Sequence, residues 1–111
     1  MAKIIDSSAN ITKAQIFNLE HESTEKMAEA EGEPLEIVSW ILQEREGDDG
    51  NPYRVLIVES ADGLYYSTGS DTFINVFTDA LEAFGEVKKI NVATRKSRKS
   101  GRDYLTLSIV E

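Results

Sequence analysis

Residues 71–84, Asp71-Thr-Phe-Ile-Asn-Val-Phe-Thr-Asp-Ala-Leu-Glu-Ala-Phe84, decide the fold. Apolar side chains recur there at spacings of three and four, which is the pattern of one buried helix face. They are Phe73, Ile74, Phe77, Ala80, Leu81 and Phe84. Ser70 is a suitable N-cap, and Gly85 suits the position just past the helix end. The sequence therefore predicts one amphipathic helix, and the segments on both sides of it have the patterns of β-strands.

Three strands are predicted before this helix. Residues 35–42 form an apolar, partly β-branched run that is typical of a strand buried on both faces. Residues 44–51 are polar, contain two glycines and precede a proline, so they predict a turn. Residues 53–59 give the next strand, and Asp62-Gly63 predicts a tight hairpin with residues 64–66 as the returning strand.

A second hairpin is predicted after the helix. Apolar and β-branched residues alternate on its two arms, with residues 97–101 as the turn; they are Ile90, Val92 and Thr94, then Leu105, Leu107 and Ile109. Five strands with a helix between the third and the fourth are the element order of an OB-fold, a small Greek-key barrel. A β-grasp fold or another small α+β sheet has the same number of strands and helices. The helix position and a basic, glycine-containing last loop favour a mainly β, five-stranded OB-fold-like barrel.

The first third of the chain is acidic and weakly patterned. Residues 14–19 suggest a short strand, and Ser23 or Thr24 would cap a short helix that ends at Gly32. The glutamates here read as a solvated face or as a surface for a basic partner protein; they are Glu20, Glu22, Glu25, Glu29, Glu31, Glu33 and Glu36. The length indicates a single domain over residues 1–111, in which residues 1–34 form an acidic N-terminal segment.

Charge is distributed unevenly along the chain. The net charge is −8, yet residues 88–102 hold seven of the twelve basic residues and no acid. Residues 1–87 hold eighteen acidic and only five basic residues, a net charge of −13. One positive element on an acidic body suggests a localised polyanion-binding site, while a surface hairpin kept basic for solubility is the plainer alternative.

Binding to a single strand without sequence preference requires cations for phosphates and aromatic rings for bases. The candidate phosphate contacts are Lys88, Lys89, Arg95, Lys96, Arg98, Lys99 and Arg102. Four or five simultaneous contacts would give a slope of log affinity against log salt of about −3. The candidate stacking residues are Trp40, Tyr53, Tyr65, Tyr66 and Tyr104, and each of these rings is alternatively part of the core.

Residues 94–106, Thr-Arg-Lys-Ser-Arg-Lys-Ser-Gly-Arg-Asp-Tyr-Leu-Thr, resemble the last hairpin of single-stranded-DNA-binding proteins. The small phage members are similar over about residues 35–110, including Asp62-Gly63-Leu64-Tyr65-Tyr66 and the helix that opens at Ser70. The resemblance implies an OB-fold, binding to single-stranded DNA during phage DNA replication, and a place in the host cytoplasm. The acidic glycine- and proline-rich tail through which bacterial members recruit partners is not seen after the last strand, so recruitment of replication proteins by such a tail is not expected.

Enzymatic chemistry has little support in the sequence. There is no cysteine, and the single histidine, His21, lies among glutamates. The acids of the predicted turn, Glu44, Glu46, Asp48 and Asp49, lack the spacing of a calcium loop, and residues 67–70 lack the lysine of a P-loop. We therefore expect no enzyme, cofactor or metal. With no signal peptide or membrane-spanning stretch, we expect a cytoplasmic protein.

Two functions of different class follow. The first is a protein that coats single-stranded DNA and uses the basic hairpin. The second is an acidic interaction module that mimics nucleic acid and binds a basic protein through residues 20–36 and 44–49. Neutralising the hairpin cations would abolish binding only in the first case.

Overall fold

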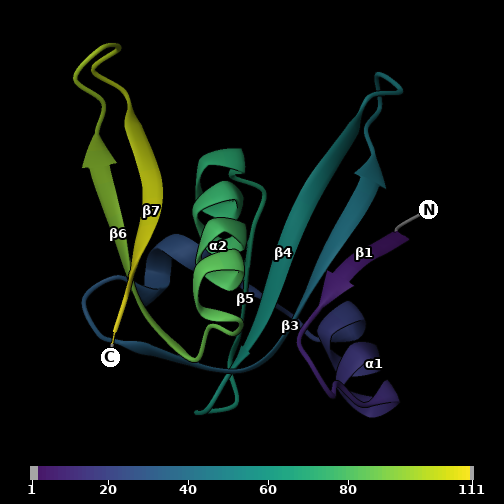
Figure 1. Cartoon of the computed structure of the whole chain (residues 1–111). Helices are drawn as coiled ribbons and strands as arrows, with labels where there is room; N and C mark the ends of the chain where they lie inside the picture. The colour runs from purple at the N-terminus through teal and green to yellow at the C-terminus, as the bar shows by residue number, and fades with distance from the viewer. Residues whose placement is uncertain (1–2, 111) are drawn as a thin grey trace.

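The computed structural model describes residues 3–110 and is mainly β, with seven strands and two α-helices (Figure 1). In chain order the elements are β1 (Lys3–Ser7), α1 (Lys13–His21), β2 (Glu25–Lys26), the 3-10 helix η1 (Met27–Ala30), β3 (Leu35–Glu46), β4 (Pro52–Ser60), β5 (Tyr65–Thr68), α2 (Asp71–Phe84), β6 (Lys89–Lys96) and β7 (Asp103–Ile109). The five strands predicted from the sequence correspond to β3–β7. The very short β2 and the N-terminal β1 were not predicted.

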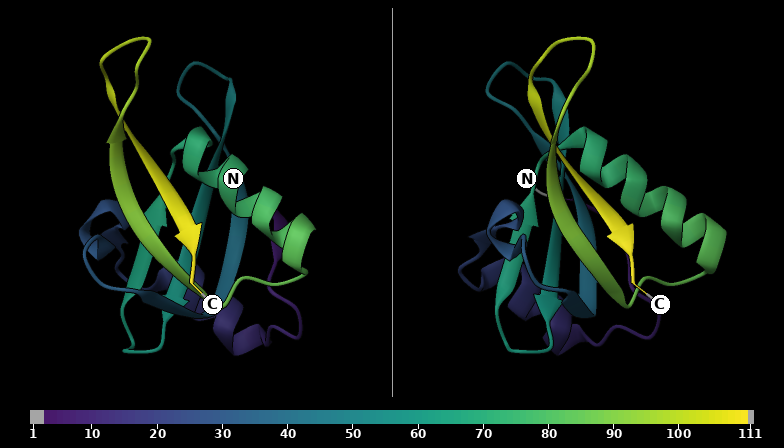
Figure 2. Two further views of the ribbon diagram at one scale, coloured as in Figure 1. Left: turned by 60° about the vertical axis from the view of Figure 1, so that its left-hand side comes forward. Right: turned by 90° about the vertical axis from the view of Figure 1, so that its left-hand side faces the viewer.

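The strands form one curved sheet in the order β2-β5-β4-β3-β6-β7, with β1 paired to β3 off this path. If the five predicted strands β3–β7 are counted as strands 1 to 5, then strands 4, 1, 2 and 3 lie side by side in that order. This arrangement is a Greek key. The β3–β4 and β6–β7 hairpins diverge as two arms, and α2 lies between them (Figures 1 and 2). The sheet is thus a half-barrel that the helix helps to fill.

Strand β3 changes partners along its length, and its register with β4 shifts between Ile37 and Ser39, a local irregularity of the kind that bends a strand. β6 pairs with its first residues, Leu35 and Glu36, whereas β1 pairs with residues 41–44 on the same edge. β4 pairs along most of the other edge. The prediction that this strand is buried on both faces holds for residues 39–43, while Val38 is 51% exposed.

Helix α2 has the predicted bounds and supplies the larger core, but Phe84, predicted on its buried face, is 59% exposed because it lies in the last turn beyond the sheet contacts. The Ser70 hydroxyl accepts a hydrogen bond from the Phe73 N–H, and Gly85 ends the helix with a φ of 81°. Phe77 is buried against Trp40, whose ring meets it edge-on at a centroid separation of 5.2 Å. Residues from both arms of the sheet join this helix in one hydrophobic core.

Helix α1 corrects the prediction of a strand at residues 14–19. Thr12 and Gln15 form a capping box, in which each side chain accepts a hydrogen bond from the other residue's backbone N–H, at 3.0 and 2.9 Å. Leu19 then packs with Ile41 and Val55 on the sheet face opposite α2, as a second, smaller core. Ile16, Phe17 and Leu19 fit a strand as well as a helix. The capping box is the local feature that favours the helix.

Two smaller differences concern turns. The helix predicted after Ser23 or Thr24 is only the 3-10 turn Met27–Ala30, and no side chain caps it. The turn predicted over residues 44–51 is shorter, because β3 continues to Glu46 and β4 begins at Pro52. As a result β3 and β4 form a hairpin that projects beyond the body of the sheet (Figure 1).

Across residues 3–110, neither α-helix has the length and apolar character needed to span a membrane.

Candidate nucleic-acid interface

The turn between β6 and β7 carries five exposed cations, which we call the basic tip: Arg95, Lys96, Arg98, Lys99 and Arg102. The turn is well ordered by backbone contacts, because Ser97 donates to the Arg102 carbonyl and Gly101 donates to the Ser97 carbonyl, both at 2.9 Å. Gly101 has a φ of 71°, a conformation that favours glycine. The five charges therefore lie on the end of β6 and on a hydrogen-bonded turn.

None of the five cations forms an ion pair with any other residue in the described range 3–110. The ion pairs found there are Arg54 with Asp71 and Lys88 with Glu86, each at 3.2 Å. Strand alternation places Arg95 and Lys96 on opposite faces of the hairpin. One carboxylate lies nearby, because Asp103 follows Arg102 and is the register partner of Lys96, but it forms no ion pair with the five cations in the described chain. The basic tip is consequently a source of net positive charge.

Lys88 and Lys89 are not brought to this tip. They lie at the opposite end of β6, and seven residues of extended strand separate Lys89 from Lys96 by roughly 20 Å. Lys88 is also paired with Glu86. The sequence suggested one continuous basic segment, but the hairpin geometry divides it into a tip of five cations and a distant pair.

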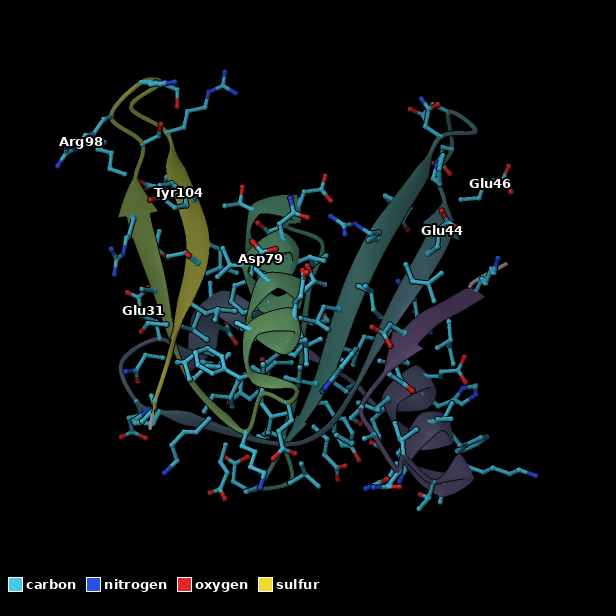
Figure 3. The ribbon with its side chains drawn as sticks, in the orientation of Figure 1. Glu31, Glu44, Glu46, Asp79, Arg98 and Tyr104 are labelled. Atoms are coloured by element: carbon cyan, nitrogen blue, oxygen red, sulfur yellow. The ribbon has the colours of Figure 1, made fainter. Side chains whose placement is uncertain are left out.

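A hollow of about 760 Å³ adjoins the basic tip. Its wall includes Tyr104 and Thr72, the latter in the first turn of α2. Tyr104 is half-buried and lies directly opposite Arg95 in the β6–β7 ladder (Figure 3 shows Tyr104 and Arg98 on this hairpin). The hollow thus joins five cations, one carboxylate (Asp103), one aromatic ring and the positively polarised start of a helix.

Two of the five predicted stacking residues are buried. Trp40 is 5% exposed and packs against Phe77, and Tyr66 is 8% exposed on the α2 side of the sheet. Burial also raises the pKa of the Tyr66 hydroxyl. Both rings belong to the main core, so neither offers an open face for a base in this conformation.

Tyr65 occupies an intermediate position. It packs against the smaller core beneath α1, and its hydroxyl donates a 3.4 Å hydrogen bond to a Glu59 carboxylate oxygen. Burial, followed by the charges of Glu59 and Glu22, raises the pKa of this phenol. The Glu59 carboxylate is held in turn by the hydroxyl of Ser39 at 2.8 Å. Tyr65 therefore belongs to a partly buried polar network with Glu59 and Ser39.

Tyr53 is 47% exposed and is the register partner of Arg45 at the base of the β3–β4 turn. Arg45 is held in place because its Nε and Nη2 both donate to the Gln43 Oε1, at 3.1 and 2.9 Å. A second hollow, of about 500 Å³, includes these two residues together with Lys26. Each of the two projecting hairpins thus carries one arginine–tyrosine pair, Arg45 with Tyr53 and Arg95 with Tyr104.

Arg45 and Lys26 were not among the residues predicted from the sequence. Arg45 could have been found from the sequence, because a hairpin whose turn spans residues 47–51 places Arg45 opposite Tyr53. Lys26 gave no such signal, since it reaches the hollow only through the parallel pairing of β2 with β5, in which it lies opposite Ser67.

The other hairpin tip is acidic, with Glu44, Glu46, Asp48 and Asp49 around the β3–β4 turn. Asp49 shapes this turn by accepting from the Asn51 N–H and side-chain amide at 3.0 and 3.1 Å, and these bonds lower the pKa of its carboxyl. Nowhere in residues 3–110 do three or more metal-ligating side chains gather closely enough to hold a metal ion. The acids are dispersed over an exposed hairpin.

No protein-family model matches this chain, and no curated protein or solved structure matches it either.

Proposed function

We propose that this protein binds single-stranded DNA without sequence preference and coats it during DNA replication. The observation that carries the proposal is the basic tip, five exposed cations on a protein whose net charge is −8. A localised positive element of this kind attracts phosphates, while the acidic remainder of the surface repels them. Binding would thus be confined to one end of the molecule.

The arrangement of β3–β7 supports an OB-type barrel as the scaffold for this activity. The Greek-key order and the helix between the third and fourth of these strands are the pattern of that fold. OB-type barrels grip oligonucleotides through the loops between strands 1 and 2 and between strands 4 and 5. In this chain those loops are the tips of the two projecting hairpins.

The arginine–tyrosine pairs supply the stacking part of the proposal. Rings that are partly open to solvent suit base stacking, and an arginine beside each ring adds a charge for the neighbouring phosphate or a planar group that itself stacks. Tyr104 and Tyr53 meet this requirement, whereas Trp40 and Tyr66 do not. We expect Tyr104 to contribute most because it adjoins the basic tip.

The test is a titration of fluorescently labelled oligothymidine, followed by anisotropy at low salt. The wild-type protein should bind it, and the variant with Arg95, Lys96, Arg98 and Lys99 all replaced by alanine should lose binding. The matched control replaces four exposed lysines away from the tip by alanine and so changes the net charge equally: Lys3, Lys13, Lys88 and Lys89. That control should retain most of its affinity.

The result is decisive in either direction. An oligothymidine affinity that is equal in the wild type and the tip variant would refute the proposal. Equal losses in the tip variant and the control would show that net charge, rather than this hairpin, governs binding. Tryptophan fluorescence is a poor readout for stacking here because Trp40 is buried, so the label is placed on the oligonucleotide.

A further inference from the structure

The end of the molecule that carries the basic tip also carries a second projecting hairpin of opposite charge. Glu44, Glu46, Asp48 and Asp49 surround the β3–β4 turn, and Arg45 is the one basic residue between Glu44 and Asp49. Lys3 and Arg54 lie opposite Glu44 on the two neighbouring strands. Figure 3 shows Glu44 and Glu46 on this hairpin and Arg98 on the other, with α2 between the two arms. Any polyanion that reaches the basic tip therefore approaches an acidic hairpin as well.

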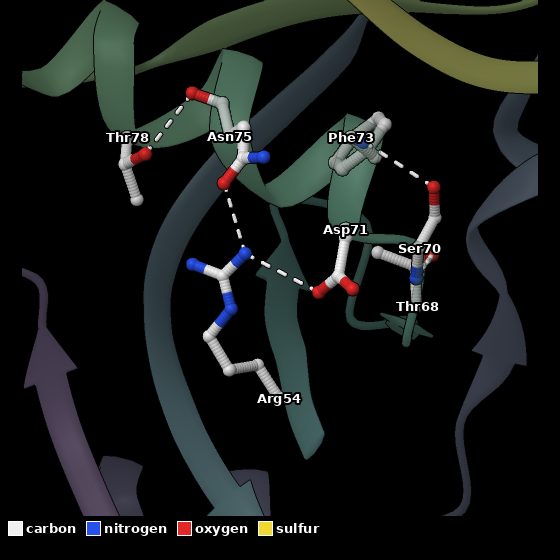
Figure 4. A network of polar contacts seen from close by, with 7 residues as sticks. All are labelled: Arg54, Thr68, Ser70, Asp71, Phe73, Asn75 and Thr78. Carbon is white, nitrogen blue, oxygen red and sulfur yellow. Dashed lines mark hydrogen bonds and ion pairs between the residues drawn. The ribbon is translucent and has the colours of Figure 1, made fainter. Parts of the chain in front are cut away.

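The helix between the arms does not relieve this repulsion. Its exposed residues include Asp79 and Glu82, and Asp79 lies on the open side of α2 in Figure 3. Arg54 extends from β4 to the start of the helix, but its Nη2 is already engaged by Asp71 at 3.2 Å and by the Asn75 side-chain oxygen at 2.9 Å (Figure 4). Arg54 thus links the sheet to the start of the helix, and the neighbouring Asp71 carboxylate offsets its charge.

We propose that the acidic wall formed by Glu44, Glu46, Asp48, Asp49 and Asp79 makes binding selective for single strands by repelling duplex DNA. This inference rests on the proposed function. It assigns no ligand to the carboxylates. Their role is to disfavour the wrong partner, which is a common source of specificity at charged interfaces.

The physical reason lies in charge density and stiffness. A duplex carries about one phosphate per 1.7 Å of its axis, twice the density of one of its strands, and its persistence length is about 50 nm. A single strand is flexible enough to contact the basic tip and Tyr53, at the base of the β3–β4 hairpin, without running along the acidic turn beyond it. A duplex docked on the same tip cannot bend away over so short a distance, and its second strand adds phosphates on the side of the wall.

Screening by salt limits this repulsion to phosphates that come close to the wall. The two arms diverge on either side of α2 (Figure 1), and the Debye length at 0.1 M salt is about 10 Å. Repulsion is therefore weak for a single strand on the basic tip, but it acts on a duplex whose second strand extends between the arms toward the wall.

The test compares the affinities for oligothymidine and for a duplex of the same length, at one salt concentration. The wall variant is Glu44→Gln, Glu46→Gln, Asp48→Asn; it keeps Asp49, which organises the turn. The control variant, Glu20→Gln, Glu22→Gln, Glu33→Gln, removes the same charge from exposed positions on α1, just after it and before β3. We expect the wall variant to gain about tenfold or more in duplex affinity and about threefold or less in oligothymidine affinity.

The ratio of the two affinities separates the outcomes. A wall variant that binds oligothymidine but still rejects the duplex like the wild type would overturn this inference and leave the proposed function intact. An equal gain in the control variant would also overturn it, because the effect would then belong to net charge. If the wild-type protein binds neither nucleic acid, the proposed function itself fails. Circular dichroism of each variant establishes that it is folded.

Discussion

Replacing Arg98 and Lys99 by alanine should make single-strand binding less sensitive to salt, whereas replacing Lys88 and Lys89 should not. Both double variants lose the same charge from the same hairpin region. They differ in position, because Arg98 and Lys99 belong to the basic tip, while Lys88 and Lys89 lie roughly 20 Å away at the other end of β6. The pair of variants therefore isolates geometry from net charge.

The magnitude follows from the number of cations at the tip. Each phosphate contact contributes about −0.7 to the slope of log affinity against log salt for a single strand, so four or five contacts give a slope of about −3. Without Arg98 and Lys99 the slope should fall to about −2. Between about 50 and 200 mM salt, the wild type should lose about sixtyfold in affinity and this variant only about sixteenfold.

The assay is the anisotropy of labelled oligothymidine measured at several potassium chloride concentrations. The Lys88 and Lys89 variant should give a slope close to that of the wild type. Equal slopes for the two double variants, whether both unchanged or both shallower, would refute the assignment of phosphate contacts to the tip. They would indicate instead that the whole hairpin, or the overall charge, determines affinity.

Three further results are expected. Tyr104→Ala should weaken oligothymidine binding by about 1–3 kcal/mol, as expected for the loss of one stacked base, while Tyr104→Phe should bind like the wild type; equal losses in both would assign the effect to the hydroxyl rather than the ring. Phe77→Ala should destabilise the fold by about 3–5 kcal/mol in urea denaturation followed by the fluorescence of Trp40, and a loss below about 1 kcal/mol would contradict its central place in the core. Hydrogen bonds from the Ser60 hydroxyl and the Leu64 N–H lower the pKa of Asp62, so its stabilising effect is present above the unfolded-state pKa of about 4 and is lost as the pH falls below it. Asp62→Asn should accordingly flatten the acid limb of a stability-against-pH curve, and an unchanged limb would speak against this role.

Most of the fold was predictable because its signals are local. The apolar face of α2, the Ser70 cap and Gly85 set the helix to its observed bounds. The Asp62-Gly63 turn set the β4–β5 hairpin, whose partners include Val58 with Tyr66. Elements without such signals were missed. β1 is held by its pairing with β3, and β2 is only two residues long and depends on β5.

The candidate site was predictable in charge but not in position. Clustering in the sequence identified the cations of the basic tip, yet it also included Lys88 and Lys89, because composition does not reveal which end of a strand a residue occupies. The aromatic residues show the same limit. Tyr66 and Tyr65 are adjacent in sequence, and strand alternation sends one to the main core and the other to the smaller core, so neither equals Tyr53 in exposure.

Strand β3 has a consequence for how this chain acquires its structure. It pairs with β1, β4 and β6. β6 follows it in the sequence by more than forty residues, and Leu35 of β3 pairs with Ile90 of β6. The β4–β5 and β6–β7 hairpins can pair locally, but they become parts of one sheet only when β4 and β6 both pair with β3. We therefore expect the chain to melt in one all-or-none step and to refold slowly, on the millisecond to second scale usual for topologies dominated by distant pairings.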